Sequence, residues 1–312
     1  MDEHARIARF FAPLCAAESG AFVLTNDAAM LAAPTGKKLV VTTDSVIEGV
    51  HVPLGTSPAR IAQKLLRRNL SDLAAMGALP WRYSLNLHTP NATPDAWFSA
   101  FARSLAREQK HFGMVLIGGD TTSARKSVVH VSATLIGLAS RAHPRSGARP
   151  GDGVYVSGTI GDAAAYFWQR THSKKITPAL AARFYAPTPR LALGQALHGI
   201  ASSVIDISDG LLADTAQLCA ASKVGAQIAF PSIPRARAYL ASGCPALETT
   251  NFGDDYELLF TVPKAKQTRL TLLSETLGMR LTRIGEITPN TRVEIMDAQG
   301  KPLTLPQGFS HH

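Results

Sequence analysis

Residues 40–51 read VVTTDSVIEGVH, and residues 68–80 read RNLSDLAAMGALP. In the first stretch an apolar run ends at Asp44, and His51 follows seven residues later. In the second, Asp72 lies within an Ala- and Leu-rich pattern that predicts a helix. A buried carboxylate is unfavourable unless it is paired or bound to a metal ion. Acids at a strand end and inside an apolar helix therefore predict a bound cation.

Acidic side chains also follow or interrupt apolar segments elsewhere in the chain. Asp27 interrupts the segment LTNDAAML, and an apolar run leads into the sequence Gly119-Asp120. Several oxygen-bearing side chains crowd a predicted strand-to-helix turn at residues 206–209. The candidate acids that share this context are Asp27, Asp44, Asp72, Asp120, Asp206 and Asp209. Carboxylates gathered in one site repel each other, so their convergence would require cations between them.

The donor set of this candidate site is hard and rich in oxygen, because few Cys or His residues accompany the acids. Such a set favours Mg²⁺ or Mn²⁺ over zinc or copper. Thr42 and Thr43 directly precede Asp44, so three oxygen side chains in a row offer a cradle for a cation. Because Mg²⁺ usually completes its coordination with water and phosphate, we expect a phosphate-bearing ligand.

Each of these features, taken singly, also has a structural interpretation. Asp44 could be a turn residue after a β-branched strand. Asp72 could be a solvated helix residue, and Asp209 could cap the helix that follows it, because the helix dipole favours acids there. His51 could be an ordinary loop histidine. The metal site is predicted by the combination and not by any one residue.

Composition limits the classes of protein to which the chain can belong. Its length of 312 residues and its 46% hydrophobic content predict a globular protein of two domains. The net charge of +9 raises the possibility of nucleic-acid binding, but the basic residues are scattered and no RNP-like or zinc-finger motif accompanies them. We therefore expect no nucleic-acid partner, and interpret the charge as a basic surface that attracts small anions.

Cysteine usage and hydropathy indicate the compartment. The three cysteines form no CxxC pair, which argues against a disulfide framework or a zinc site and fits a reducing environment. No apolar run reaches membrane-spanning length, and the N-terminus lacks a signal-peptide pattern. We expect a cytoplasmic protein with no membrane partner.

Hydrophobic periodicity and turn residues predict alternating helices and strands, hence an α/β (α+β) fold. The Pro-, Gly- and Arg-rich stretch near residues 142–151 predicts a boundary between domains 1–142 and 143–312, and THSKKITPAL reads as a polar linker. Helices are predicted at residues 3–17, 58–76, 94–112, 161–170, 189–198, 211–222 and 264–277. Strands are predicted at residues 39–43, 81–88, 114–117, 127–138, 154–157, 204–206, 258–262, 281–287 and 293–296.

The common nucleotide-binding and hydrolase motifs do not occur in the chain. There is no GxxxxGK[ST] loop, no protein-kinase motif set and no GxSxG elbow. The Gly-rich sequence YVSGTIGDA does not have the GxGxxG spacing of a dinucleotide site. If the chain uses ATP, metal ions and backbone groups must hold the phosphates in place of a P-loop lysine.

An ordered series of motifs resembles the thiamine-monophosphate kinase family, whose superfamily also contains aminoimidazole-ribotide synthetase and selenophosphate synthetase. The matching motifs are NDAA, TTDSVIEGVH, NLSDLAAMGALP, GGDTT, RSGARPGD, DISDGL, GDDYELLF and the closing GF. They follow the family's order over nearly the whole chain, and the ordered set is specific although no single tripeptide is.

The resemblance implies a fold, an activity and a set of site residues. It implies two α/β domains, with an N-terminal mixed sheet that pairs with a second copy in a barrel-like homodimer interface. It implies transfer of the ATP γ-phosphate to thiamine monophosphate, giving thiamine diphosphate and ADP. The implied Mg²⁺ ligands are Asp27, Thr42, Thr43, Asp44, Asp72, Asp120, Asp206 and Asp209. The implied ATP contacts are Gly119, Asp120, Arg145 and Ser208, and the implied thiamine contacts are His51, Asp254 and Phe309.

Two positions depart from the family pattern. Asn26 stands where the family usually has a first acid before the Ala pair, and Asp254 stands where the family's loop has a longer Glu. No general base is assigned, because the attacking phosphate oxygen is already ionised and phosphoryl transfer mainly requires positioning and charge stabilisation. Two alternatives are another ATP-dependent synthetase of the superfamily and a non-catalytic nucleotide-binding protein.

Overall fold

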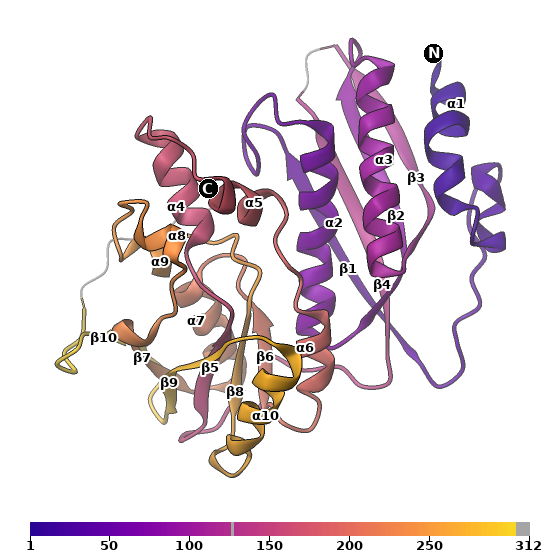
Figure 1. Cartoon of the computed structure of the whole chain (residues 1–312). Helices are drawn as coiled ribbons and strands as arrows, with labels where there is room; N and C mark the ends of the chain where they lie inside the picture. Colours follow the sequence, from indigo (N-terminus) through magenta and orange to yellow (C-terminus); the bar gives the residue numbers. More distant parts are fainter. Residues whose placement is uncertain (126–127, 304–312) are drawn as a thin grey trace. The chain divides into compact units, whose positions relative to one another are not determined.

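The computed structural model of the chain describes residues 1–125 and 128–303. Figure 1 traces the order of the helices and strands along the chain. The fold is mixed α/β, with one four-stranded and one six-stranded sheet, which confirms the predicted fold class. Within the described residues, no helix combines the length and the apolar character that crossing a lipid bilayer requires.

The chain folds as two compact units, each with its own sheet. The N-terminal unit comprises Met1–Leu73 and Ala78–Arg141. The C-terminal unit comprises Ala74–Gly77 and the residues from Ala142 onward. The four-stranded sheet belongs to the N-terminal unit and the six-stranded sheet to the C-terminal unit.

The sheet of the N-terminal unit has the strand order β1-β4-β2-β3. Its strands are β1 (Lys38–Ile47), β2 (Leu79–Pro90), β3 (Val115–Ala124) and β4 (His130–Ala139). Strand β4 is antiparallel to both of its neighbours, whereas β2 and β3 are parallel. Parallel neighbours need a crossover connection, and the helix α3 (Asp95–Phe112) provides it.

Helices α2 (Pro58–Ala75) and α3 cover one face of this sheet, as Figure 1 shows. Their apolar faces are fully buried, for example at Leu66 and Leu70 in α2 and at Phe101 in α3. Strand β4 alternates regularly between buried and half-buried residues, as a strand with one covered face does. On the other face of the sheet, Leu39 and Val41 of β1 are 49% and 60% exposed.

The predicted helix at residues 3–17 is broken into three short pieces in the structure. These are α1 (Glu3–Arg6), a π-helical turn at Ile7–Phe11 and a 3₁₀ turn at Ala12–Cys15. Pro13 lacks a backbone N–H and cannot continue an α-helix at this point. A further 3₁₀ segment, Ser19–Leu24, leads to the loop that contains Asp27.

The C-terminal unit has the strand order β10-β7-β9-β5-β8-β6. Its strands are β5 (Gly153–Ser157), β6 (Ser203–Asp206), β7 (Gly225–Ala229), β8 (Leu258–Val262), β9 (Leu281–Thr288) and β10 (Val293–Met296). Its helices are α4 (Asp162–Thr171), α5 (Pro178–Tyr185), α6 (Leu191–Ala196), α7 (Leu211–Ser222), α8 (Arg237–Leu240), α9 (Glu248–Asn251) and α10 (Thr268–Leu277).

Both faces of this second sheet are buried, because alternate residues of its strands enter two separate hydrophobic clusters. Val154 and Leu259 pack in one cluster with Leu218 of α7. Tyr155 and Phe260 pack in the other cluster, which also contains leucines of α6 and α10. Strands β5, β6 and β8 are buried along their whole length, which explains their continuous apolar character.

Helices α5, α8 and α9 and strand β7 of the C-terminal unit were not predicted from the sequence. The polar stretch interpreted as a linker runs into helix α5, which begins at Pro178, a favourable residue for the first helical turn. Strand β7 was not predicted, because its sequence GAQIA contains mostly small residues. It forms because β9 pairs with it on one side and β10 on the other.

Candidate functional site

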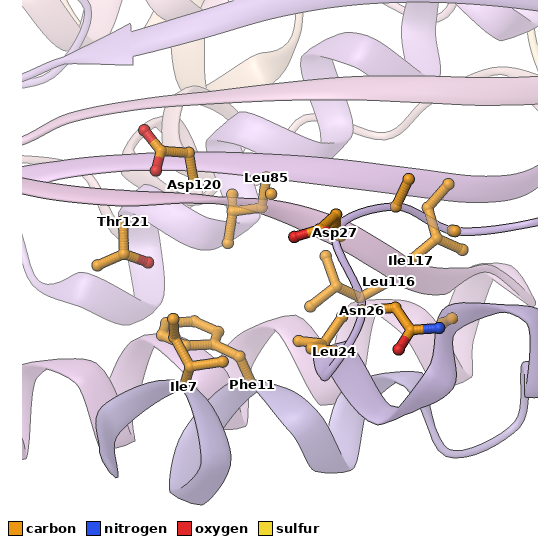
Figure 2. Close-up of a pocket in the computed structure, with 15 residues that line it drawn as sticks. Ile7, Phe11, Leu24, Asn26, Asp27, Leu85, Leu116, Ile117, Asp120 and Thr121 are labelled. Atoms are coloured by element: carbon orange, nitrogen blue, oxygen red, sulfur yellow. The ribbon is translucent and has the colours of Figure 1, made fainter. Parts of the chain in front are cut away.

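A pocket of about 130 Å³ lies beside strand β3 in the N-terminal unit. Figure 2 shows the Asp27 and Asp120 carboxylates at the upper side of this cavity and the apolar side chains of Ile7 and Phe11 at its lower side. Both aspartates are exposed to solvent. The structure thus brings together two of the acids that the sequence predicted for a metal site, from a loop and from a strand.

Strand β3 presents Asp120 to the pocket through an irregular pairing with β2. The register shifts between Tyr83 and Ser84, so that Ser84 pairs with Gly118 and Leu85 with Gly119. Such a bulge changes the direction of the side chains that follow it. A Cβ atom on Gly119 would lie 1.8 Å from the backbone oxygen of Leu85, so only glycine fits there.

We expect the replacement Gly119→Ala to destabilise the protein by about 1–3 kcal/mol, the usual cost of forcing an extra group into a packed site. The matched control is Gly118→Ala, because a Cβ atom at Gly118 has no neighbour within 4 Å. Urea unfolding of both variants measures the difference. Equal midpoints for the two variants would contradict the close packing of β2 and β3 at this point.

Strand β1 and helix α2 hold a second group of the predicted residues. The Thr42 hydroxyl donates a hydrogen bond of 2.5 Å to Oδ2 of Asp72. Asp44 forms an ion pair of 2.8 Å with Nε of Arg68, and Nη1 of Arg68 donates a hydrogen bond of 2.8 Å to the backbone oxygen of Ser45. Arg68 and Asp72 are four residues apart and therefore share the face of α2 that meets β1.

Thr43 lies on the opposite face of β1, where its hydroxyl is 2.8 Å from that of Thr134. Successive strand residues point to opposite faces, so the side chains of Thr42, Thr43 and Asp44 do not surround one common point. The cradle of three consecutive oxygen side chains is therefore divided between the two faces of the sheet. Thr42 and Asp44 remain on the face that also carries Asp72.

His51 follows β1 in a tight turn. The backbone N–H of Ile47 donates to its Nδ1 at 3.1 Å. A nitrogen that accepts a hydrogen bond carries no proton, so the neutral ring of His51 has its proton on Nε2. This ring can donate from Nε2, which is suited to an oxygen-bearing ligand.

In the C-terminal unit, the turn between β6 and α7 is held by Asp214. Its Oδ2 accepts hydrogen bonds from the backbone N–H groups of Ser208, Asp209 and Gly210, at 3.0, 3.0 and 3.1 Å. Burial raises the pKa of Asp214 to about 7, although these N–H groups act in the opposite direction. Asp206 is buried before the turn, whereas Asp209 is exposed.

Arg145 reaches the same turn through one bridging side chain. Its Nη1 donates to Oε1 of Gln217 at 2.9 Å, and Nε2 of Gln217 donates to Oδ2 of Asp209 at 3.3 Å. Gln217 lies in α7, two turns after Asp209. The predicted nucleotide contacts Arg145 and Ser208 therefore lie around one turn, together with Asp209.

The loop that carries Asp254 packs directly on this turn. The backbone N–H of Asp254 donates to the backbone oxygen of Ser208 at 2.9 Å. A Cβ atom on Gly253 would lie 2.0 Å from that same oxygen, so the approach requires glycine. The hydroxyl of Tyr256 donates to Oδ1 of Asp254 at 2.7 Å and fixes its carboxylate.

The structure brings many of the predicted site residues together in three groups, each held by shared contacts or by one pocket. Asp27, Gly119 and Asp120 share a pocket, Thr42, Asp44 and Asp72 share a strand–helix face, and the C-terminal residues surround one turn. Phe309 lies outside the described residues. Sequence reasoning missed Arg68, Asp214, Gln217 and Tyr256, although the four-residue spacing of Arg68 and Asp72 was a usable signal.

The donors in each group are suited chemically to Mg²⁺, since they are carboxylate and hydroxyl oxygens. Among the described residues, no three His, Cys, Asp or Glu side chains gather into a group that could hold a metal ion by itself. Mg²⁺ is usually held by one or two carboxylates, with water and substrate phosphates completing the coordination. Pairs such as Asp27 and Asp120 are consistent with that requirement.

Comparison with known proteins gives matches along most of the chain. The model of the AIR synthase related protein N-terminal domain matches residues 25–139, and that of the C-terminal domain matches residues 149–298. The thiamine-monophosphate kinase of Salmonella typhimurium is 37% identical over 300 residues, which cover 92% of this chain and 90% of the relative.

Solved structures show the same similarity. The crystal structure of thiamine-monophosphate kinase from Stenotrophomonas maltophilia has a TM-score of 0.81 and 36% identity, and the match covers 90% of this chain and 91% of that chain. A structure of AaThiL complexed with AMPPCP and TMP has a TM-score of 0.79 and 29% identity, with 92% of this chain and 91% of that chain covered.

Proposed function

Because this chain belongs to the AIR synthase related proteins and, within them, to the thiamine-monophosphate kinases, we propose that it phosphorylates thiamine monophosphate with ATP. The products would be thiamine diphosphate and ADP. The observation that carries this proposal is the similarity, over 92% of the chain, to a relative that was solved with AMPPCP and TMP. AMPPCP is a non-hydrolysable analogue of ATP, so that relative holds a nucleotide and a phosphate acceptor together.

We propose that different residues of the chain bind the nucleotide and the thiamine substrate. Ser208 and Arg145 surround one turn and would bind the nucleotide, with Gly119 and Asp120 of the β3 pocket. His51, with its proton on Nε2, and Asp254, whose carboxylate is fixed by Tyr256, would orient the thiamine substrate. Phe309 is proposed as a further contact to the substrate ring.

Both substrates are polyanions, so the chemistry requires positive charge between them. The residues proposed to hold Mg²⁺ are Asp27, Thr42, Thr43, Asp44, Asp72, Asp120, Asp206 and Asp209. When bound, several Mg²⁺ ions would neutralise negative charge on the phosphates of the two substrates. The side chain of Thr43 faces away from those of Thr42 and Asp44, so Thr43 would contribute to a different part of the site.

The transfer is proposed to be direct and in line, without a covalent intermediate on the protein. The attacking oxygen of thiamine monophosphate is already ionised near neutral pH, so no side chain has to remove a proton from it. The protein would contribute positioning of the two phosphates and stabilisation of the charge on the group in transfer. Accordingly no residue is assigned as a general base.

The test of this function is incubation of the purified chain with MgATP and thiamine monophosphate, followed by chromatographic separation of the products. We expect thiamine diphosphate and ADP in equal amounts, and no product when EDTA removes the metal. Thiamine in place of thiamine monophosphate is the control for the acceptor. ADP formed without thiamine diphosphate would overturn the assignment and would favour another ATP-dependent reaction.

We also propose that the chain forms a homodimer through the face of the N-terminal sheet opposite α2 and α3. Leu39 pairs across strands with Leu138, and Leu138 pairs with Leu79. Val41 pairs with Ile136 in the next row. Leu39, Val41 and Leu79 are 49%, 60% and 50% exposed, so an apolar surface continues across three strands. Covering such a surface is favourable, and a second copy offers the same surface.

The replacement Val41→Glu is expected to weaken this dimer by at least about 100-fold, because it would bury an unpaired charge in the interface. Sedimentation velocity of the wild type and the variant over a range of concentrations measures the effect. Leu272→Glu is the matched control, since Leu272 is 69% exposed on α10 in the C-terminal unit. A monomeric wild type, or equal weakening by both variants, would contradict the proposed interface.

A further inference from the structure

Beneath the loop that carries Asp254, the C-terminal unit encloses a cage of charged side chains. Asp162, Asp255 and Glu257 are 4%, 2% and 0% exposed. Arg190 pairs with Glu257 through Nε at 2.6 Å, and Nη2 of Arg183 pairs with it at 2.8 Å. The cage therefore contains three buried carboxyl groups and two guanidinium groups.

Two carboxyl oxygens of this cage lack the partner that burial normally requires. Among the described residues, no hydrogen-bond donor reaches Oδ1 of Asp162 or Oδ2 of Asp255. Buried polar atoms are nearly always hydrogen-bonded. Two buried oxygens without a donor in one cage therefore indicate that the cage also holds a proton or a cation. With all carboxyls ionised, the cage would also hold one more negative charge than positive.

The contacts distinguish which carboxyl carries the proton. Asp162 is an ion-pair partner of Arg183 at 3.6 Å, and it accepts a hydrogen bond from the hydroxyl of Thr159. Glu257 forms ion pairs with both Arg183 and Arg190. Among the described residues, the carboxyl of Asp255 accepts one hydrogen bond, from the backbone N–H of Gly161 at 2.8 Å, whereas Nη2 of Arg183 donates to the backbone oxygen of Asp255.

We propose that Asp255 is held as a neutral carboxylic acid inside this cage and that, in this form, it positions the loop carrying Asp254. The proton resides on Oδ2, the carboxyl oxygen of Asp255 that no hydrogen-bond donor of the described residues reaches. Asp255 is buried and would act through the loop, so it is proposed as a positioning residue. The pKa of Asp255 is raised well above its usual range, chiefly by burial and further by the charges of Asp162 and Glu257, against the opposing effects of Gly161 and Arg183.

The loop needs such an anchor because its backbone is strained on both sides of Asp255. Asp254 has φ 68° and Tyr256 has φ 52°, a left-handed conformation that residues with side chains rarely adopt. Such conformations persist only where the surroundings impose them. Asp255 contributes two restraints, through its carboxyl to Gly161 and through its backbone oxygen to Arg183.

Infrared difference spectroscopy of the unliganded protein tests the protonation state directly. We expect the difference between the wild-type and Asp255→Asn spectra near neutral pH to contain a carbonyl stretching band of a protonated carboxylic acid. Any contribution of Asp214, whose pKa is about 7, is common to both proteins and cancels in this difference. The comparison variant is Asp162→Asn, in which the band of Asp255 is expected to persist. Absence of the band from this difference, or its loss only in Asp162→Asn, would overturn the proposal.

A bound monovalent cation is the alternative occupant of the cage, and thermal unfolding separates it from a proton. Melting temperatures in sodium, potassium and choline chloride at equal ionic strength are expected to agree. A melting temperature that rises with sodium or potassium in the wild type and not in Asp255→Asn would assign the cage to a cation and would overturn the neutral acid.

The positioning role is tested by kinetics and rests on the proposed kinase function. Asparagine reproduces the donor and acceptor of a neutral acid, so Asp255→Asn is expected to keep the wild-type KM for thiamine monophosphate. Asp255→Leu removes both groups and is expected to raise that KM about tenfold, with a smaller change in the KM for ATP. Equal KM values for the leucine variant and the wild type would contradict the positioning role. A wild-type protein without kinase activity would count against the proposed function. The protonation state of Asp255 would still be decided by the infrared spectra, which require no activity.

Discussion

Replacing Asp120 by asparagine is expected to lower kcat for thiamine diphosphate formation by about 10²–10³-fold, the usual loss when one electrostatic stabiliser of a transition state is removed. Asp120 is exposed in the β3 pocket beside Asp27, so its charge is available to a ligand and does not support the core. The amide keeps the size of the side chain but removes its charge. Steady-state kinetics at saturating MgATP measures the effect.

The stability of Asp120→Asn is expected to stay within about 0.5 kcal/mol of the wild type, because surface substitutions usually do so. Glu275→Gln is the matched control for the change of charge, since Glu275 is exposed on α10, in the unit that does not contain the β3 pocket. It should leave kcat unchanged. Undiminished turnover in Asp120→Asn would remove Asp120 from the proposed metal and nucleotide site.

Much of the fold could be predicted because the apolar periodicity of most elements is strong. The predicted helix at residues 211–222 and the predicted strand at residues 293–296 have the bounds observed in the structure. Strand β7 escaped prediction because GAQIA is short and consists mostly of small residues, and its strand conformation depends on the neighbours that pair with it. The helix predicted at residues 3–17 is interrupted in the structure, and Pro13 lacks the backbone N–H that an α-helix would need at this point.

The candidate site could be predicted only as a set of residue types. An acid at the end of an apolar run indicates a ligand but does not say which side chain stands beside it, and Arg68 pairs with Asp44 from another element. The period of two in a strand was sufficient to show that Thr43 faces away from Thr42. Asp214 reads as an ordinary helix residue in the sequence, and its role depends on a turn that brings three N–H groups to one oxygen.

Removing the Glu257 side chain by Glu257→Ala is expected to destabilise the protein by about 3–5 kcal/mol, because loss of one partner leaves a buried charge without compensation. Glu257 is fully buried and accepts from Arg190, Arg183 and the hydroxyl of Ser157. Without it, both guanidinium groups would lose their principal partner. Urea unfolding measures the free energy of unfolding of the variant.

The pair of Arg283 and Glu286 provides the matched control in the same unit. Its atoms are 2.7 Å apart, but the two side chains are 48% and 55% exposed. An exposed ion pair of this kind contributes about 0–1 kcal/mol, so Glu286→Ala should hardly change the unfolding midpoint. Both variants remove a glutamate that forms an ion pair with arginine, so the difference between their losses of stability reports the effect of burial. Equal losses of stability would mean that the cage around Glu257 is open to water, and the anchor for the Asp254 loop would then be lost as well.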